Sequence, residues 1–133
     1  MAFRVPATLA ITAFATALLV AASPAWPQTP PAPAPPDGAT LFKRQCGTCH
    51  TAGAGEPNRQ GPNLHGVLGR VAGKQEGFRY SPALAGSEIR WDAATLDAWL
   101  ADSAKLVPGS VMPYRQANPA IRGAIIDWLK EGN

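Results

Sequence analysis

The cysteines of this chain are confined to one short stretch, residues 45–51, which reads QCGTCHT. Cys46 and Cys49 are three positions apart, and His50 follows the second cysteine directly. The chain has 133 residues and no other cysteine. Two thiols and an imidazole at this spacing constrain the fold more than any other feature, because whatever they bind must be packed into a small domain.

Four kinds of chemistry use such a pair of cysteines. In an oxidising compartment the pair could form a disulfide. A thioredoxin-like redox motif belongs to a βαβ pattern, which this sequence does not display. A zinc ion could draw on both cysteines, His50 and His65, although the adjacent residues Cys49 and His50 rarely turn toward one metal. The fourth is covalent haem, because C-x-x-C-H is the attachment sequence of c-type haem.

The spacing favours haem. Residues i, i+3 and i+4 lie on one face of a helix. Cys46 and Cys49 could therefore reach the two vinyl groups of one porphyrin as thioethers, with His50 placed under the iron. We expect one haem c, attached through the two cysteines and held by His50 as an axial ligand.

The opposite axial position has few candidates, and we favour Met112. It lies in the sequence VPGSVMPY, between two helical patterns, where the backbone can aim a thioether. A lone methionine more often fills a gap in a core, but the flanking Pro108, Gly109 and Pro113 indicate a loop. His65, in GPNLHGVLG, is expected to hydrogen-bond backbone and hold its loop. Remote candidates are Lys43, Lys74, Lys105 and Lys130.

The N-terminal part of the sequence indicates export. Residues 5–22 form an apolar run behind a single basic residue, Arg4, which is typical of a signal peptide and short for a membrane span. We expect residues 1–25 to be the signal peptide, cut after Ala25; an uncleaved membrane anchor is the alternative. Residues 26–36 are a proline-rich linker, and residues 37–133 form the folded domain.

Charge excludes one class of partner. Removing residues 1–25 leaves 11 Lys and Arg against 9 Asp and Glu, dispersed along the chain. This balance is too mild for a nucleic-acid-binding protein.

The remaining sequence predicts an all-α domain of three helices. They cover the stretches DGATLFKRQCGTCH with Asp37 as N-cap, WDAATLDAWLADSAKL with Asp92 as N-cap, and NPAIRGAIIDWLKEG with Asn118 as N-cap. Residues 51–90 are rich in glycine and lack periodicity, so we expect loops there. Such a long irregular segment is explained if the loops pack on a large flat cofactor.

Several separated stretches together resemble the class I c-type cytochromes, in the mitochondrial cytochrome c and bacterial cytochrome c2 branch. The resemblance covers residues 37–131 and rests on LFKRQCGTCHT, GPNLHGVLGR, GFRYSPAL, IRWDAATLDAWL and VPGSVMPY. It implies the cytochrome c fold, with His50 and Met112 as axial ligands. It also implies that the carbonyl of Pro62 accepts a hydrogen bond from His50.

The resemblance implies further roles at the haem. Arg70, Tyr80 and Trp91 would hold or screen the propionates, and Ser110 would place a hydroxyl near a propionate. Trp99 would take the place of a family tyrosine beside the haem. Gly38 and Phe42 would meet Ile126 and Trp128 where the first and last helices cross.

The chain departs from the family at the exposed haem edge. Gln45, Ala104 and Val111 stand where mitochondrial members have lysines. Basic residues near that edge are Arg44, Arg59 and Lys105. We therefore expect a weak electrostatic docking field.

Two axial protein ligands would leave the iron no open site, which favours electron transfer over catalysis. We expect a monomeric periplasmic one-electron carrier, not an enzyme, that links a quinol-oxidising complex to a terminal oxidase in a respiratory or photosynthetic chain. The alternative is a dedicated electron-acceptor subunit or partner of a periplasmic dehydrogenase. A haem enzyme such as a peroxidase would need Met112 to be absent or labile. Membrane attachment would require an uncleaved N-terminal segment.

Overall fold

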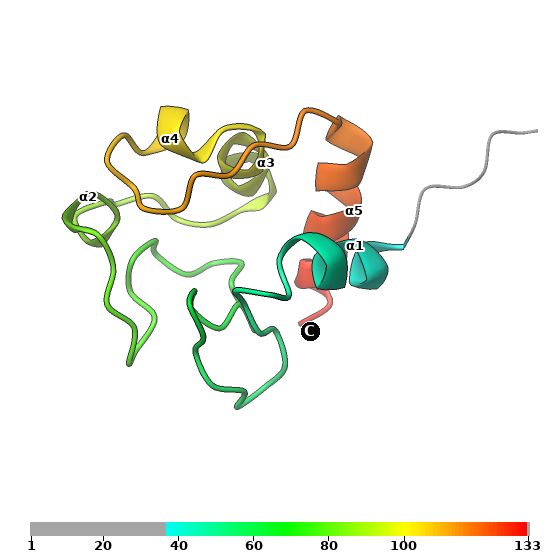
Figure 1. The fold of residues 1–133 in the computed structure, drawn as a ribbon, viewed down its shortest axis with the longest axis horizontal. Coiled ribbons are helices and arrows are strands. Elements are labelled where there is room, and N and C mark those ends of the chain that lie inside the picture. Colours follow the sequence, from blue (N-terminus) through cyan, green and yellow to red (C-terminus); the bar gives the residue numbers. More distant parts are fainter. Residues whose placement is uncertain (1–36, 133) are drawn as a thin grey trace, which may run out of the picture. The chain divides into compact units, whose positions relative to one another are not determined.

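The computed structural model describes residues 37–132. Its helices in chain order are α1 (Gly38–Gln45), α2 (Pro82–Ala85), α3 (Ala93–Ala101), α4 (Ser103–Leu106) and α5 (Pro119–Lys130) (Figure 1). Between residues 37 and 132 there is no strand, only an isolated bridge between Val71 and Arg90. The predicted all-α class is confirmed. The expected signal peptide and linker lie outside the described residues.

The first helix begins where the sequence predicts. The Asp37 side chain accepts a hydrogen bond from the backbone N–H of Thr40 at 2.9 Å, as expected of an N-cap. Leu41 and Phe42 are buried on its inner face. The helix ends at Gln45, with Cys46 as C-cap, so it stops just before the cysteine motif.

The segment predicted as one helix over residues 91–106 is two helices. Asp92 and Thr95 form a reciprocal capping box that starts α3. At Asp102 the backbone becomes extended, and the Asp102 carboxylate caps α4 by accepting from the N–H of Lys105. An aspartate side chain can compete with the helix for backbone donors, and this competition explains the break.

Residues 51–90 are mostly irregular, as predicted, but they contain the short helix α2. Ser81 caps this helix and Pro82 occupies its first position. Four residues are too few to produce a recognisable apolar period. Gly73 has φ 70°, and a Cβ there would lie 2.2 Å from the carbonyl oxygen of Leu84. Glycine therefore lets this loop pass directly against α2.

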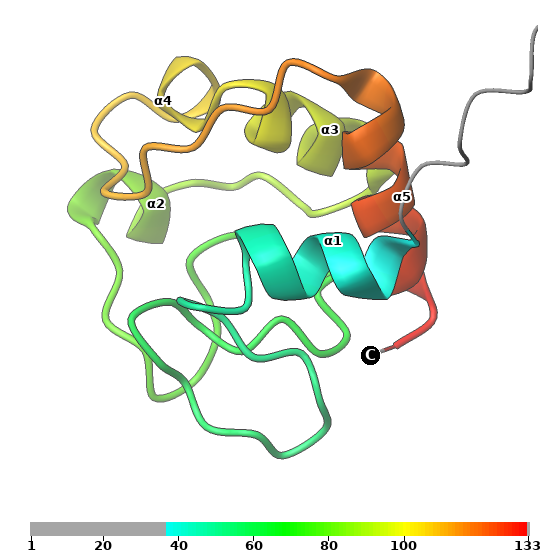
Figure 2. The same ribbon diagram turned by 45° about the vertical axis from the view of Figure 1, so that its right-hand side comes forward.

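Helix α5 packs against both α1 and α3 (Figure 2). Asn118 caps α5, as expected, by accepting from the N–H of Ala120. At the crossing with α1, the rings of Phe42 and Trp128 lie 4.7 Å apart. A Cβ at Gly38 would lie 2.2 Å from the carbonyl oxygen of Ala124. The crossing is thus the predicted one, although the backbone partner of Gly38 is Ala124.

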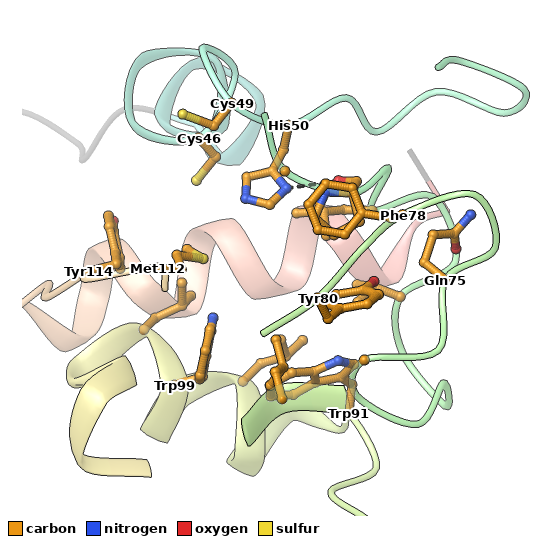
Figure 3. Close-up of a pocket in the computed structure, with 18 of the residues that line it drawn as sticks. Cys46, Cys49, His50, Gln75, Phe78, Tyr80, Trp91, Trp99, Met112 and Tyr114 are labelled. Atoms are coloured by element: carbon orange, nitrogen blue, oxygen red, sulfur yellow. Dashed lines mark hydrogen bonds between the residues drawn. The ribbon is translucent and has the colours of Figure 1, made fainter. Parts of the chain in front are cut away.

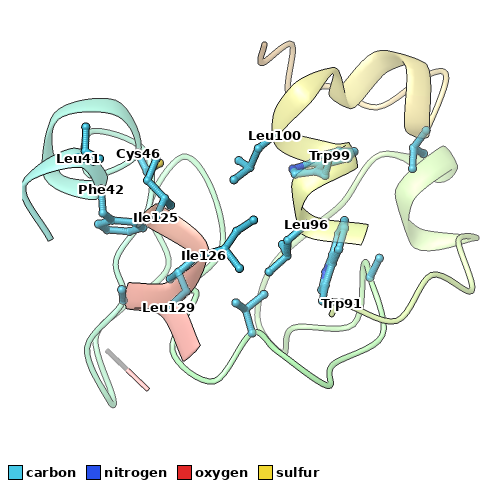
Figure 4. Packing of buried hydrophobic residues seen from close by; sticks show 14 residues of the cluster. Leu41, Phe42, Cys46, Trp91, Leu96, Trp99, Leu100, Ile125, Ile126 and Leu129 are labelled. Carbon is cyan, nitrogen blue, oxygen red and sulfur yellow. The ribbon is translucent and has the colours of Figure 1, made fainter. Parts of the chain in front are cut away.

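The buried apolar side chains form one cluster, to which two groups of elements contribute (Figure 4). One group comes from α1 and α5 and includes Phe42, Ile125 and Leu129. The other comes from α3 and the preceding segment, where the rings of Trp91 and Trp99 meet edge to face at 5.5 Å. No helix among residues 37–132 is long and apolar enough to cross a membrane.

Candidate functional site

The cysteine motif lies in a hydrogen-bonded turn immediately after α1. The backbone N–H groups of Cys49 and His50 both donate to the carbonyl of Cys46, at 3.0 and 2.9 Å. The sequence placed these residues within the helix, whereas the helix has ended. The turn nevertheless keeps helix-like i→i+3 and i→i+4 bonds, so the two thiols and the imidazole still share one side of the backbone (Figure 3).

Cys46 and Cys49 do not form a disulfide. Burial raises the pKa of the Cys46 thiol to about 11, so it is protonated at neutral pH. Residues 37–132 contain no group of three or more His, Cys, Asp or Glu side chains that could hold a metal ion. The zinc alternative therefore lacks support in the described part of the chain.

His50 is fixed by one strong contact. Its side chain is buried, and its Nδ1 lies 2.8 Å from the carbonyl oxygen of Pro62. Because a carbonyl only accepts, Nδ1 carries the proton and Nε2 keeps its lone pair. Burial lowers the pKa of His50, and the bond to Pro62 opposes part of that shift. The imidazole is therefore neutral near pH 7, with Nε2 free to bind a metal.

A cavity of about 340 Å³ is lined by apolar side chains of α1, α3 and α5. This volume lies within the usual range for small-molecule and cofactor sites, about 300–1,000 Å³. The sequence-predicted site residues that line it are Cys46, Cys49, His50, Pro62, Arg70, Tyr80, Trp91, Trp99 and Met112. Ser110 is not among the lining residues. The fold thus brings nine of the ten predicted residues around one space.

The Met112 segment is anchored by a serine that the sequence analysis missed. Ser103, at the start of α4, is fully buried. Its hydroxyl donates to the carbonyl of Met112 and accepts from the N–H of Tyr114 at 3.0 Å. These two bonds lie on either side of Pro113 and hold the backbone directly after the Met112 side chain beside the cavity.

Arg70 provides a polar group in the lining of the cavity. The Arg70 guanidinium donates to the carbonyl of Asn63 at 3.0 Å and to the side chain of Gln75. Burial lowers the pKa of Arg70 and raises the pKa of Tyr80. Gln75 also supplies a backbone hydrogen bond to Tyr80. The sequence analysis missed Gln75, because its place depends on how the loop folds back on Arg70.

The expected loop-tying role of His65 is wrong. His65 is exposed, and its backbone N–H donates to the Asn63 side chain. The residue that ties loops is Asn58, which accepts from the N–H of Asn63 at 2.8 Å and donates to the carbonyl of Glu76 at 3.2 Å. Asparagine can accept and donate at the same time, and His65 lies on the outer side of the turn.

Three observations show that the cavity fits a haem attached to the two cysteines. The donor set matches, because a neutral imidazole and a thioether from separate segments both line one space (Figure 3). Gly61 leaves room for the His50 ring, since a Cβ there would lie 2.3 Å from Cε1 of the imidazole. Ser110 does not itself line the cavity, but its Oγ is the one buried side-chain polar atom in residues 37–132 without a partner, which leaves it free to bond to a group outside the polypeptide.

Comparison with known proteins agrees with this geometry. The cytochrome c family matches residues 36–133. A cytochrome c from Kluyveromyces lactis is 46% identical over 58% of this chain and 70% of its own length. One from Ulva intestinalis is 39% identical over 73% and 88%, and one from Arabidopsis thaliana is 40% identical over 71% and 85%. Proteins of this family carry electrons on a haem bound covalently through cysteines. The chain therefore belongs to the cytochrome c family and carries haem c through Cys46 and Cys49.

Proposed function

We propose that this cytochrome is a periplasmic one-electron carrier in which His50 and Met112 are the axial ligands. It would pass electrons from a quinol-oxidising complex to a terminal oxidase. The observation that carries the proposal is the pairing of two ligand types on one cavity. His50 presents an unprotonated Nε2 because Pro62 fixes its tautomer, and Met112 lines the same cavity, with its carbonyl held by the Ser103 hydroxyl.

Haem c, when bound, supplies an iron that alternates between Fe(II) and Fe(III). The chain's residues decide what that iron can do. His50 and Met112 together would occupy both axial sites, so substrates such as peroxide would find none free. A soft thioether and an apolar wall that includes Trp99 and Leu96 both disfavour the additional positive charge of the oxidised state. Both effects raise the reduction potential.

Three measurements on one preparation test this proposal. The protein is produced with its N-terminal segment in a host that matures c-type cytochromes, and its intact mass reports covalent haem and the cleavage site together. We expect periplasmic protein cut after Ala25. The oxidised protein should show the long-wavelength sulfur–iron charge-transfer band, and potentiometric titration should fit one electron. A five-coordinate spectrum with peroxidase turnover would contradict the carrier proposal.

A second candidate is a dedicated partner of one periplasmic dehydrogenase. It is favoured by Val111, the residue before Met112, which is 80% exposed although it is apolar. Gln45 and Ala104 are likewise uncharged, so the basic residues expected near this edge are reduced to Arg44, Arg59 and Lys105. An apolar docking surface predicts electron transfer that hardly changes between about 10 and 200 mM salt, whereas electrostatic steering falls steeply. A stable stoichiometric partner from periplasm would favour this candidate.

A further inference from the structure

We propose that Gln45 is a positioning residue: its side-chain amide bridges the haem-attachment turn to the Met112 segment and holds Met112 on the iron. This inference rests on the proposed ligation by Met112. It is carried by contacts between residues about 70 positions apart in the sequence.

The Met112 segment is extended, and its side chains alternate. Val111, Pro113 and Arg115 are exposed. Met112, Tyr114 and Gln116, between them, are half-buried. Alternate side chains of an extended segment share one face, so these last three residues all face inward. Met112 lines the cavity, with Tyr114 beside it (Figure 3).

The side chain of Gln45 forms hydrogen bonds with the side chains of both Tyr114 and Gln116. Its Oε1 accepts from the hydroxyl of Tyr114 at 2.7 Å and from Nε2 of Gln116 at 2.9 Å. Gln45 is the last residue of α1 and directly precedes Cys46. A single amide oxygen therefore connects the turn that carries Cys46, Cys49 and His50 to the extended segment 111–116, which we call the Met112 strap.

One end of this bridge is firmly held. The backbone N–H of Gln116 donates to the carbonyl of Leu100 in α3 at 2.8 Å, and its carbonyl accepts from Arg122 in α5 at 2.8 Å. Gln45 is thereby bonded to a part of the strap that α3 and α5 hold in place. Its second bond, to Tyr114, then resists outward movement of the strap. Ser103, at the start of α4, holds the backbone of the same strap, and the strap's side-chain hydrogen bonds to α1 within residues 37–132 all go to Gln45.

The test measures how easily Met112 leaves the iron. Imidazole, titrated into the oxidised holoprotein, competes with Met112, and loss of the sulfur–iron band reports its binding. One net hydrogen bond corresponds to a factor of roughly 2 to 10 in an equilibrium constant. We expect Tyr114→Phe to increase the apparent imidazole affinity by that factor. Gln45→Leu, which removes both bonds, should increase it by about tenfold or more.

Two further variants separate positioning from a general structural effect. Gln45→Glu retains an acceptor for both donors and should stay within about threefold of wild type. Adding Tyr114→Phe to Gln45→Leu should change the affinity no further, because the shared bond is already lost. Arg115→Gln is the matched control: it lies on the same strap but faces solvent and pairs with Asp102, so its removal should have an effect below about twofold.

The possible outcomes distinguish a failure of the positioning role of Gln45 from a failure of the ligation by Met112. If Gln45→Leu and Tyr114→Phe bind imidazole as wild type does, the positioning role is refuted, even with the band present in all three proteins. If wild type itself lacks the band, the ligation by Met112 fails, and the proposed function with it. If Gln45→Leu does not accumulate as holoprotein, Tyr114→Phe, which removes one oxygen atom, decides the question alone.

Discussion

Gly61 lies against the imidazole of His50, so close that a Cβ at Gly61 would be 2.3 Å from the ring atom Cε1. This approach lets the next residue, Pro62, present its carbonyl to Nδ1 at 2.8 Å. The absence of one side chain therefore sets both the tautomer and the orientation of His50. Any side chain introduced at Gly61 should therefore displace the imidazole of His50 more than any other group.

Gly61→Ala should destabilise the holoprotein by about 1–3 kcal/mol, the usual cost of overpacking a filled site. The ring must shift, so the bond from Nδ1 to Pro62 should lengthen and the reduction potential should change with it. Guanidinium unfolding and potentiometry measure the two effects. The same substitution at Gly123, inside α5 with open space around its Cβ position, is the control. It should be neutral or stabilise by about 0.5–1 kcal/mol, since alanine favours helix.

Met112→His tests axial ligation directly. The variant should retain covalent haem, because Cys46 and Cys49 are untouched, and should lose the sulfur–iron band. Replacing a soft thioether by imidazole stabilises Fe(III), so the reduction potential should fall, by a substantial part of the roughly 0.8 V over which axial ligands tune haem. A potential and a near-infrared spectrum identical to wild type would show that Met112 does not bind the iron.

The sequence was most informative where chemistry is encoded in adjacent residues. The spacing of Cys46, Cys49 and His50 is sufficient to predict the cofactor, and Asp37, Asp92 and Asn118 mark helix starts through local capping. Long-range partners carry no such local signature. Ser103 and Gln45 act through contacts with a strap that is distant in sequence, and their own neighbourhoods resemble ordinary helix ends.

The orientation of Tyr114 could have been predicted from the sequence. Tyr114 lies two residues after Met112 in a stretch where Pro113 prevents helix, so it was bound to face the same side as Met112. The break at Asp102 was less accessible. A continuous helix through residues 91–106 is locally favourable. Two interactions interrupt it: the Asp102 carboxylate caps α4, and the Ser103 hydroxyl bonds to the carbonyl of Met112.

Ser103→Ala should loosen the Met112 strap. The substitution leaves the N–H of Tyr114 and the carbonyl of Met112 without their partner in a buried site, which costs about 1–3 kcal/mol. Guanidinium unfolding of the holoprotein measures this loss. Ser87→Ala is the control, because its Oγ accepts one longer bond, 3.2 Å from the N–H of Ile89, near the surface. Equal effects of the two substitutions would contradict the anchoring role of Ser103.

The capping box of α3 predicts an acid-dependent stability. Hydrogen bonds from the backbone and side chain of Thr95 hold the pKa of Asp92 below the ordinary aspartate value of 3.8. The unfolded chain therefore takes up a proton at this carboxyl before the folded chain does. The stabilisation is complete above about pH 4 and is lost as the pH falls through the lower, folded-state pKa.

Asp92→Asn separates this effect from the rest of acid unfolding. Asparagine is also a good N-cap but does not titrate, so the variant should keep its cap at low pH. Guanidinium midpoints of both holoproteins, measured from pH 6 to about pH 2.5, should differ by a constant amount above about pH 4. Below that, the difference should move in favour of the variant, because only wild type loses its carboxylate. Protonation of other groups, His50 included, affects both proteins alike and cancels in the comparison. A difference that stays constant over the whole range would mean that the bonds from Thr95 do not depend on the charge of Asp92.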